Sequence, residues 1–170
     1  TCVDPGGTEI GDALRELLLR RASPIGVRCE AMLFMASRAQ LVAQVIEPAL
    51  DAGHIVIADR FLLANVVYQG HAGGLDPAEL WRMGDFATAG LRPDLTFVLD
   101  LPPEAARARR ARSPDRIEKR DAAYHERVRA GFLAEAERNP LKMRVIDAVA
   151  SVESVHQAIC GALAKMLSIA

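Results

Sequence analysis

Short apolar segments alternate with helical patterns along this chain, and that alternation constrains the fold more than any other feature. Residues 54–59, 95–100 and 143–147 are apolar runs of strand length, and each ends in an aspartate. Such runs, separated by helices of ten or more residues, predict a parallel sheet flanked by helices, the α/β class. Because ligands bind at the carboxyl ends of the strands in such sheets, we expect a site at that edge.

The predicted helices are defined by apolar stripes and by capping residues. Ile10 and Leu14 belong to a stripe over residues 9–21, and Asp76 followed by Pro77 is typical of the start of a helix. The other predicted helices cover residues 26–50, 62–68, 103–110, 121–138 and 151–167. The helix over 26–50 is apolar around most of its circumference, so we expect it to pack between neighbours, either within the subunit or across a subunit boundary. With no linker or repeat, we predict one domain over residues 1–170.

Composition excludes several kinds of partner. The net charge of −1 provides no overall attraction to nucleic acid or to a membrane surface. No apolar run approaches the roughly 18 residues of a membrane span. The three cysteines, Cys2, Cys29 and Cys160, show no CxxC spacing, which favours buried thiols in a reducing compartment. We therefore predict a cytoplasmic protein that binds neither nucleic acid nor membranes.

The dipeptide Asp59-Arg60 ends the first apolar run, at the expected ligand-binding edge. An isolated pair of this kind can be an ion pair that ties a strand to the following helix. Alternatively, the planar guanidinium of Arg60 suits a phosphate group. Asp59 would then orient Arg60 or lie near a phosphate-bound magnesium ion. The dipeptide alone leaves both possibilities open.

Two helical segments carry candidate base-binding side chains. Phe34 and Arg38 are four residues apart and share a helix face, although such a pair is more often a core aromatic and a surface charge. Asn65 can both donate and accept hydrogen bonds, which suits a pyrimidine edge. Tyr68 and Gln69 follow on the same segment, where Tyr68 could also be an aromatic residue at the boundary of the core.

Taken together and in this order, these segments resemble the thymidylate kinase (dTMP kinase) family. The matching stretches are Asp4-Pro5-Gly6-Gly7-Thr8, Leu33-Phe34 with Arg38, DRFLLANVVYQG over 59–70, GLRPDLTFVLDLPPE over 90–104 and DRIE over 115–118. The resemblance implies a P-loop nucleoside monophosphate kinase fold, a parallel sheet flanked by helices. It also implies transfer of the γ-phosphoryl group of ATP to dTMP, with Mg²⁺, to give dTDP for dTTP synthesis.

The family's site residues transfer to matching positions of this chain. Phe34 is implied to stack on thymine, Arg38 to donate to a thymine carbonyl, and Arg60 to hold the dTMP phosphate. The full substrate-binding set is Asp4, Phe34, Arg38, Arg60, Asn65, Tyr68 and Gln69, and Asp59 is implied to lie near the metal. The chain departs from the family at two positions, because Val3 replaces an arginine that contacts phosphate and Ala64 replaces a serine or threonine.

A strongly basic segment follows the second strand and resembles the family's lid. Residues 107–120 contain seven arginines and lysines, which could also be a solvated helix end. A lid of this kind closes over the transferring phosphoryl group, stabilises its charge and expels water. We assign catalysis to Arg60, Asp59, Arg109, Arg110 and Arg112, and ATP binding to Arg107 and Arg116.

The phosphate-binding motif GxxxxGK[ST] does not occur in the 170 residues. Because the chain begins at Thr1 on what resembles the tail of a strand, we expect a missing N-terminal segment and no ATP turnover by these residues alone. A non-catalytic nucleotide-binding or dimerising remnant is one alternative, and a kinase for another nucleoside monophosphate is a second. The family resemblance also implies a homodimer.

Overall fold

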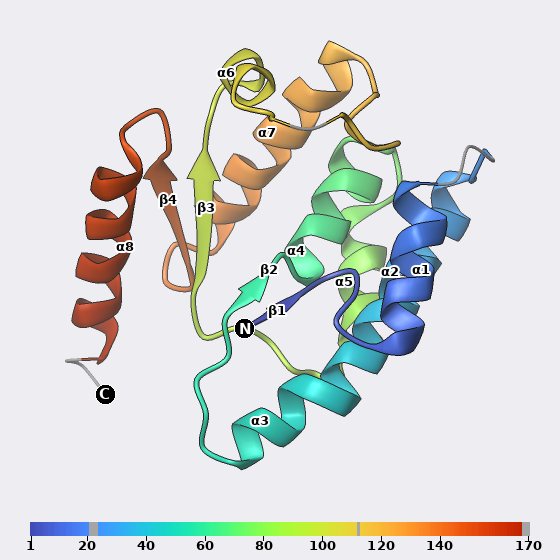
Figure 1. Cartoon of the computed structure of the whole chain (residues 1–170), viewed down its shortest axis with the longest axis horizontal. Coiled ribbons are helices and arrows are strands. Elements are labelled where there is room, and N and C mark those ends of the chain that lie inside the picture. The colour runs from blue at the N-terminus through green and yellow to red at the C-terminus, as the bar shows by residue number, and fades with distance from the viewer. Residues whose placement is uncertain (21–23, 112, 168–170) are drawn as a thin grey trace.

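The computed structural model describes residues 1–20, 24–111 and 113–167 (Figure 1). Its strands form two parallel pairs, which confirms the predicted parallel α/β class. Strand β1 (Cys2–Val3) pairs with β2 (Ala58–Asp59), and β3 (Thr96–Asp100) pairs with β4 (Met143–Asp147). In the second pair Thr96 lies opposite Met143 and Asp100 opposite Asp147.

The helices agree with the sequence predictions to within a few residues. In Figure 1 α8 lies beside β4 at one side of the molecule, and α1, α2, α4 and α5 group at the other. Their bounds are α1 Glu9–Leu19, α2 Val27–Leu41, α3 Glu47–Asp51, α4 Leu62–Asn65, α5 Pro77–Ala87, α6 Pro103–Ala108, α7 Ala122–Arg138 and α8 Val152–Leu167. Two π-helical segments, η1 (Val42–Ile46) and η2 (Val66–His71), continue α2 and α4.

The strand predicted from the apolar run over residues 54–59 is wrong for its first four residues, and the burial that an apolar strand implies is not found there. Only Ala58–Asp59 pair with another strand, while the side chains of Ile55 and Ile57 are 83% and 65% exposed. Strand β1 has only two residues, so it offers too few backbone groups to extend the pairing over the whole apolar run. The hydrophobic pattern therefore indicated a strand over residues 54–59, but within the described residues only its last two residues pair with another strand.

The predicted burial of the cysteine thiols is also wrong. Cys29 and Cys160 are exposed and Cys2 is partly buried. Cys29 lies in the first turn of α2 and Cys160 within α8, and the described residues leave both exposed. In the described part of the chain, no helix is long and apolar enough to cross a membrane.

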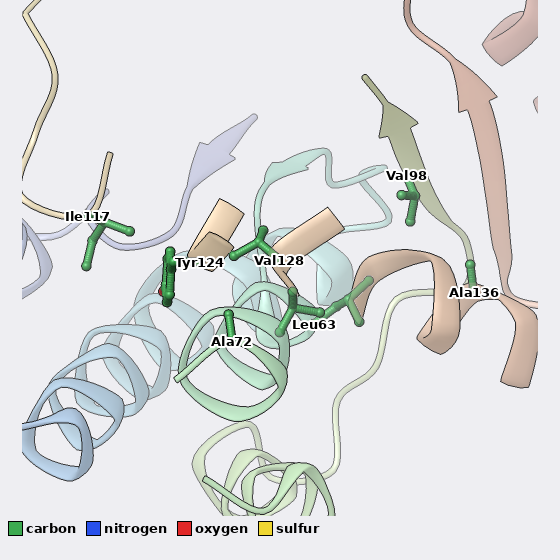
Figure 2. Close-up of a cluster of buried hydrophobic side chains, with 8 residues drawn as sticks. Leu63, Ala72, Val98, Ile117, Tyr124, Val128 and Ala136 are labelled. Carbon is green, nitrogen blue, oxygen red and sulfur yellow. The ribbon is translucent and has the colours of Figure 1, made fainter. Parts of the chain in front are cut away.

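The segment formed by α4 and η2 lies at the centre of the core. Leu62 and Val66 belong to a cluster with α2 and α5, while Leu63 and Val67 pack against β3, α7 and Ile117. Figure 2 shows the second cluster, to which Leu63, Ala72 and Val128 of α7 all belong. The residues that directly follow Asp59-Arg60 are thus held on two sides by burial, which fixes the position of Asn65 and Gln69 between them.

Helix α5 approaches α4 closely because residue 84 is a glycine. A Cβ atom at this position would lie 2.8 Å from Cγ of Leu62, which is itself only 1% exposed, and closer still to the two Leu62 methyl groups. Any larger residue must therefore displace Leu62 or separate the helices.

We expect Gly84→Ala to lower the free energy of unfolding by about 1–3 kcal/mol, because the added methyl overpacks the core. Gly161→Ala is a matched control, since no heavy atom lies within 4 Å of its added Cβ. Removing this glycine from the interior of α8 should stabilise the protein by about 0.5–1 kcal/mol. Urea denaturation of the two variants measures both changes, and equal effects would contradict the close approach of α5.

Candidate functional site

A buried ion pair connects the loop after β1 to the last turn of α2. The Arg38 Nε donates to Asp4 Oδ2 at 2.6 Å, and the two residues are 1% and 2% exposed. Burial raises the pKa of Asp4 and lowers the pKa of Arg38, because it disfavours both charges. The second oxygen of Asp4, Oδ1, is buried and has no hydrogen-bond partner within the described residues, so it is available to accept from a ligand.

The Pro-Gly-Gly turn holds Asp4 in place. Gly6 and Gly7 have φ values of 126° and 77°, a backbone conformation that residues with a Cβ rarely adopt. The Gly6 N–H donates to Ser37 Oγ at 3.2 Å, and the Asp4 N–H donates to the Asp59 carbonyl at 3.0 Å. The turn is therefore tied both to α2 and to the carboxyl end of β2.

A chain of hydrogen bonds continues from Arg38 through two side-chain amides. Arg38 Nη1 donates to Asn65 Oδ1 at 3.2 Å, and Asn65 Nδ2 donates to Gln69 Oε1 at 2.8 Å. Gln69 Nε2 then donates to Glu30 Oε1 at 2.7 Å. All four residues are at most 2% exposed, so water does not compete for these groups.

Arg38 and Glu30, at the two ends of this series of hydrogen bonds, determine how the side-chain amides of Asn65 and Gln69 are oriented. Arginine can only donate and an ionised carboxylate can only accept. A flipped Asn65 would therefore place its NH₂ group against Arg38, and a flipped Gln69 would place its oxygen against Glu30. Each mismatch of buried polar groups costs about 1–3 kcal/mol. The orientation observed is thus the one that satisfies every member of the chain.

Glu30 binds two arginines from the last part of the lid segment. Arg116 Nη2 lies 2.5 Å from Glu30 Oε2, and Arg120 Nη2 lies 2.9 Å from the same oxygen. Arg116 also donates from Nε to the Leu18 carbonyl at 2.7 Å. The guanidinium of Arg120 stacks over the ring of Tyr124 at 4.5 Å. Arg116, expected to contact ATP, is instead bound to Glu30 and to the end of α1.

Asp59 and Arg60 lie exposed at the carboxyl end of β2, where the sequence placed them. Arg60 has a φ of 65°, an uncommon value for a residue other than glycine. Such conformations persist where the surroundings hold them and are common at functional sites. The guanidinium of Arg60 lies 5.1 Å from the centre of the Tyr68 ring, which places a cation beside the aromatic residue of the next helix.

The aromatic candidates lie at the boundary of the core. Phe34 is partly buried on α2, four residues before Arg38. Tyr68 is also partly buried and packs against Tyr124 and Phe132, with ring centres 6.4 and 6.0 Å away. The hydroxyl of Tyr124 donates to the Tyr68 carbonyl at 2.9 Å, and burial raises the pKa of Tyr124 to about 12. Both candidate rings thus retain an accessible part.

The arginines of the basic segment are in different environments. Arg109 donates to the carbonyls of Ala148 and Val149 at 2.6 and 2.9 Å, so it anchors the end of α6 to the loop after β4 rather than lying free for phosphate. Arg110 pairs with Glu118 at 3.7 Å, and Arg107 is exposed. Arg112 lies outside the described residues.

Sequence analysis missed Glu30 and Arg120 as members of this site. The available signal was a lone glutamate on a helix that is apolar around most of its circumference, because an unpaired carboxylate is rarely buried. Its arginine partners follow it by 86 and 90 residues, so no local pattern connects them.

Comparisons with known proteins agree with the family resemblance. The sequence profile described as "Thymidylate kinase" matches residues 2–159. Thymidylate kinases of Symbiobacterium thermophilum and Kosmotoga olearia are 46% and 42% identical to this chain over 158 residues, covering 92% of it and 74% and 76% of the relatives. The crystal structure of thymidylate kinase from Ehrlichia chaffeensis superposes with a TM-score of 0.79 at 27% identity, covering 95% of this chain and 78% of that one.

We expect Asp4→Asn to lower the free energy of unfolding by about 3–5 kcal/mol, because it leaves the buried Arg38 without its counter-charge. Asp85→Asn is a matched control, since Asp85 pairs with Arg92 where the side chains are 50% and 31% exposed. Loss of such an exposed pair should cost less than about 1 kcal/mol. Chemical denaturation of both variants tests the difference, and similar losses would show that the Asp4–Arg38 pair is not critical.

Proposed function

The chain belongs to the thymidylate kinase family, and we propose that the buried hydrogen-bond chain around Arg38 is its thymine-recognition site. Enzymes of this family phosphorylate dTMP to dTDP with ATP, and this chain is a nucleoside monophosphate kinase of that kind. The observation that supports the assignment of the base site is the fixed guanidinium of Arg38. Asp4 holds its Nε and Asn65 accepts from its Nη1, so its donors cannot turn away.

This arrangement suits thymine because of the group that each base presents. Thymine carries a carbonyl acceptor where cytosine carries an amino donor, and Arg38 can only donate. Phe34 lies one helical turn before Arg38 and supplies an aromatic surface for stacking. The unpartnered Asp4 Oδ1 and the second N–H of Asn65 offer further contacts for donors and acceptors of the bound nucleotide.

The remaining parts of dTMP have counterparts near the same edge. We assign the phosphate to Arg60, an exposed residue directly after the carboxyl end of β2. Tyr68, beside Arg60, is positioned to border the sugar. Phosphoryl transfer requires mainly positioning and charge neutralisation. Arg110 and Arg112 of the lid remain candidates for the second role, and Arg107 remains the candidate for ATP binding. Arg109 and Arg116 have the anchoring contacts described above.

Magnesium and cytoplasmic location are also part of the proposal. Mg²⁺ is commonly held by one or two carboxylates together with substrate phosphates. The exposed carboxylate of Asp59 fits that role, and in the described residues no cluster of three potential ligands indicates a metal cage. Such an ion neutralises phosphate charge. Use of ATP as co-substrate supports a cytoplasmic location.

We propose that the protein is a homodimer that uses the hollow between α2 and α5. Phe86 and Met32 are 92% and 58% exposed there, and the lining also includes Met35, Ala36, Ala39, Met83 and Ala87. An interface with twofold symmetry joins one surface to its own copy, which requires complementary charges. Glu79 and Arg82, three residues apart on α5, are both exposed and can pair across such a contact.

We expect dTMP to bind more tightly than dCMP by about 1–3 kcal/mol, because dCMP leaves a donor facing Arg38. This difference corresponds to roughly one to two decades in Kd. Titration calorimetry with the two nucleotides measures it without requiring turnover. Equal affinities in a folded preparation would remove the assignment of Arg38 and favour a kinase for another nucleotide.

Arg60→Ala should weaken dTMP binding by about 1.5–3 kcal/mol while leaving thymidine binding nearly unchanged, since the lost contact is with phosphate. Arg92→Ala, which removes an arginine stacked over Trp81 on α5, should change neither affinity. If Arg60→Ala weakened binding of dTMP and thymidine equally, the role of Arg60 would be structural.

For the homodimer, we expect Phe86→Glu to give a monomer in sedimentation velocity, because the change places a charge in the centre of the apolar contact. Leu141→Glu changes a residue that is 86% exposed in the turn before β4, and it should leave the dimer intact. If Phe86→Glu is still a dimer, the interface does not lie in the hollow between α2 and α5.

A further inference from the structure

Glu30 occupies a position that the proposed reaction leaves unexplained. It is fully buried, its Oε1 accepts from Gln69 and from Arg120, and its Oε2 accepts from Arg116 and Arg120. No substrate role follows from these contacts, because all of them are with other residues. One carboxylate therefore serves two parts of the protein, the amide chain that leads to Arg38 and the segment 115–120.

We propose that Glu30 is a positioning residue that couples thymine recognition to docking of residues 115–120, an inference that rests on the base site proposed above. Glu30 contacts neither base nor phosphate in this proposal. It acts through Gln69 on one side and through two arginines on the other. Base binding and docking of residues 115–120, the end of the lid segment, are then linked equilibria.

The first half of the coupling is the directional amide chain. Glu30 accepts from Gln69, which requires the Gln69 oxygen to face Asn65. The Asn65 oxygen then faces Arg38. Because each amide has one donor side and one acceptor side, loss of the fixed acceptor at Glu30 frees Gln69 to turn. The position of the Arg38 guanidinium therefore depends on a carboxylate three hydrogen bonds away.

The second half is the dependence of Glu30 on residues 115–120. Arg116 donates from its backbone N–H to the Leu19 carbonyl at 3.2 Å, and Ile117 is buried in the core cluster of Figure 2. When this segment is docked, two guanidinium groups compensate the Glu30 charge. When it leaves, the buried carboxylate retains only the Gln69 amide, which is unfavourable. Docking of the segment therefore stabilises the orientation of Gln69 as well.

Coupling of this kind is reciprocal, so a ligand that favours the aligned amide chain must also favour the docked segment. We expect dTMP to slow amide hydrogen exchange across residues 115–120, even though none of these residues contacts the base. A residue that only maintained the fold would stabilise the segment equally with and without ligand. Protection that depends on ligand therefore separates coupling from a structural role.

The experiment compares hydrogen exchange of residues 115–120, with and without saturating dTMP, in the wild type and three variants. Gln69→Met has similar length and removes the amide link while keeping the arginine pairs of Glu30. Glu30→Gln keeps an acceptor for Gln69 but loses the charge that holds Arg116 and Arg120. Gln44→Met, on an exposed position of η1, is the matched control.

In the wild type and in Gln44→Met, we expect dTMP to slow exchange about tenfold, equivalent to a coupling of roughly 1.4 kcal/mol. In Gln69→Met, dTMP should still bind through Phe34 and Arg60 but give no added protection. In Glu30→Gln, hydrogen exchange of residues 115–120 should be fast both with and without dTMP. The preference for dTMP over dCMP should also fall. If Glu30→Gln fails to fold, Gln69→Met alone decides the question.

Undiminished protection in Gln69→Met, or a wild type that binds dTMP without any change at 115–120, would overturn the coupling. The base site itself is tested separately by the preference for dTMP over dCMP. If that preference is present and protection does not depend on Gln69, only the coupling fails. If the protein does not prefer dTMP over dCMP, or does not bind dTMP, the proposed base site is wrong and the coupling that rests on it is wrong too.

Discussion

The ion pair between Arg38 and Asp4 is buried, and the arrangement of the site depends on it. Removing two charges from water is costly unless the remaining donors and acceptors find partners. Asn65 meets this requirement on one side of the guanidinium, and the Pro-Gly-Gly turn holds Asp4 on the other. The pair therefore joins the first loop, the long helix and the segment after β2 into one unit.

A consequence of this burial is that polar groups far from the ligand edge become part of the site. Asn65 needs an acceptor, which Gln69 provides, and Gln69 needs one in turn, which Glu30 provides. The carboxylate at the end of the chain then needs compensating charge, which Arg116 and Arg120 supply. Partial satisfaction of such a network is worse than an apolar core. This explains why the helix over 27–41 includes a fully buried glutamate.

Exposed residues at the carboxyl end of β2 show a different principle. Asp59 and Arg60 lie close to the network, yet remain accessible to solvent. Arg60 adopts a positive φ and its guanidinium rests on the Tyr68 ring, so it is held near the edge. The residues proposed for base recognition, Arg38 and Asn65, are thus buried, whereas the residue proposed for the phosphate, Arg60, is exposed.

The sequence by itself determined the order of the elements, most helix boundaries, the strands at 96–100 and 143–147, and the family. These depend on local periodicity and capping, as with Asp76, which accepts from the Ala78 N–H as the sequence predicts. Only the tertiary structure decided that Arg109 binds backbone carbonyls, that Ile55 and Ile57 are exposed, and that Glu30 meets Arg116 and Arg120. Those outcomes depend on contacts between residues far apart in the chain, and a single sequence carries no local pattern for the partner of a buried charge.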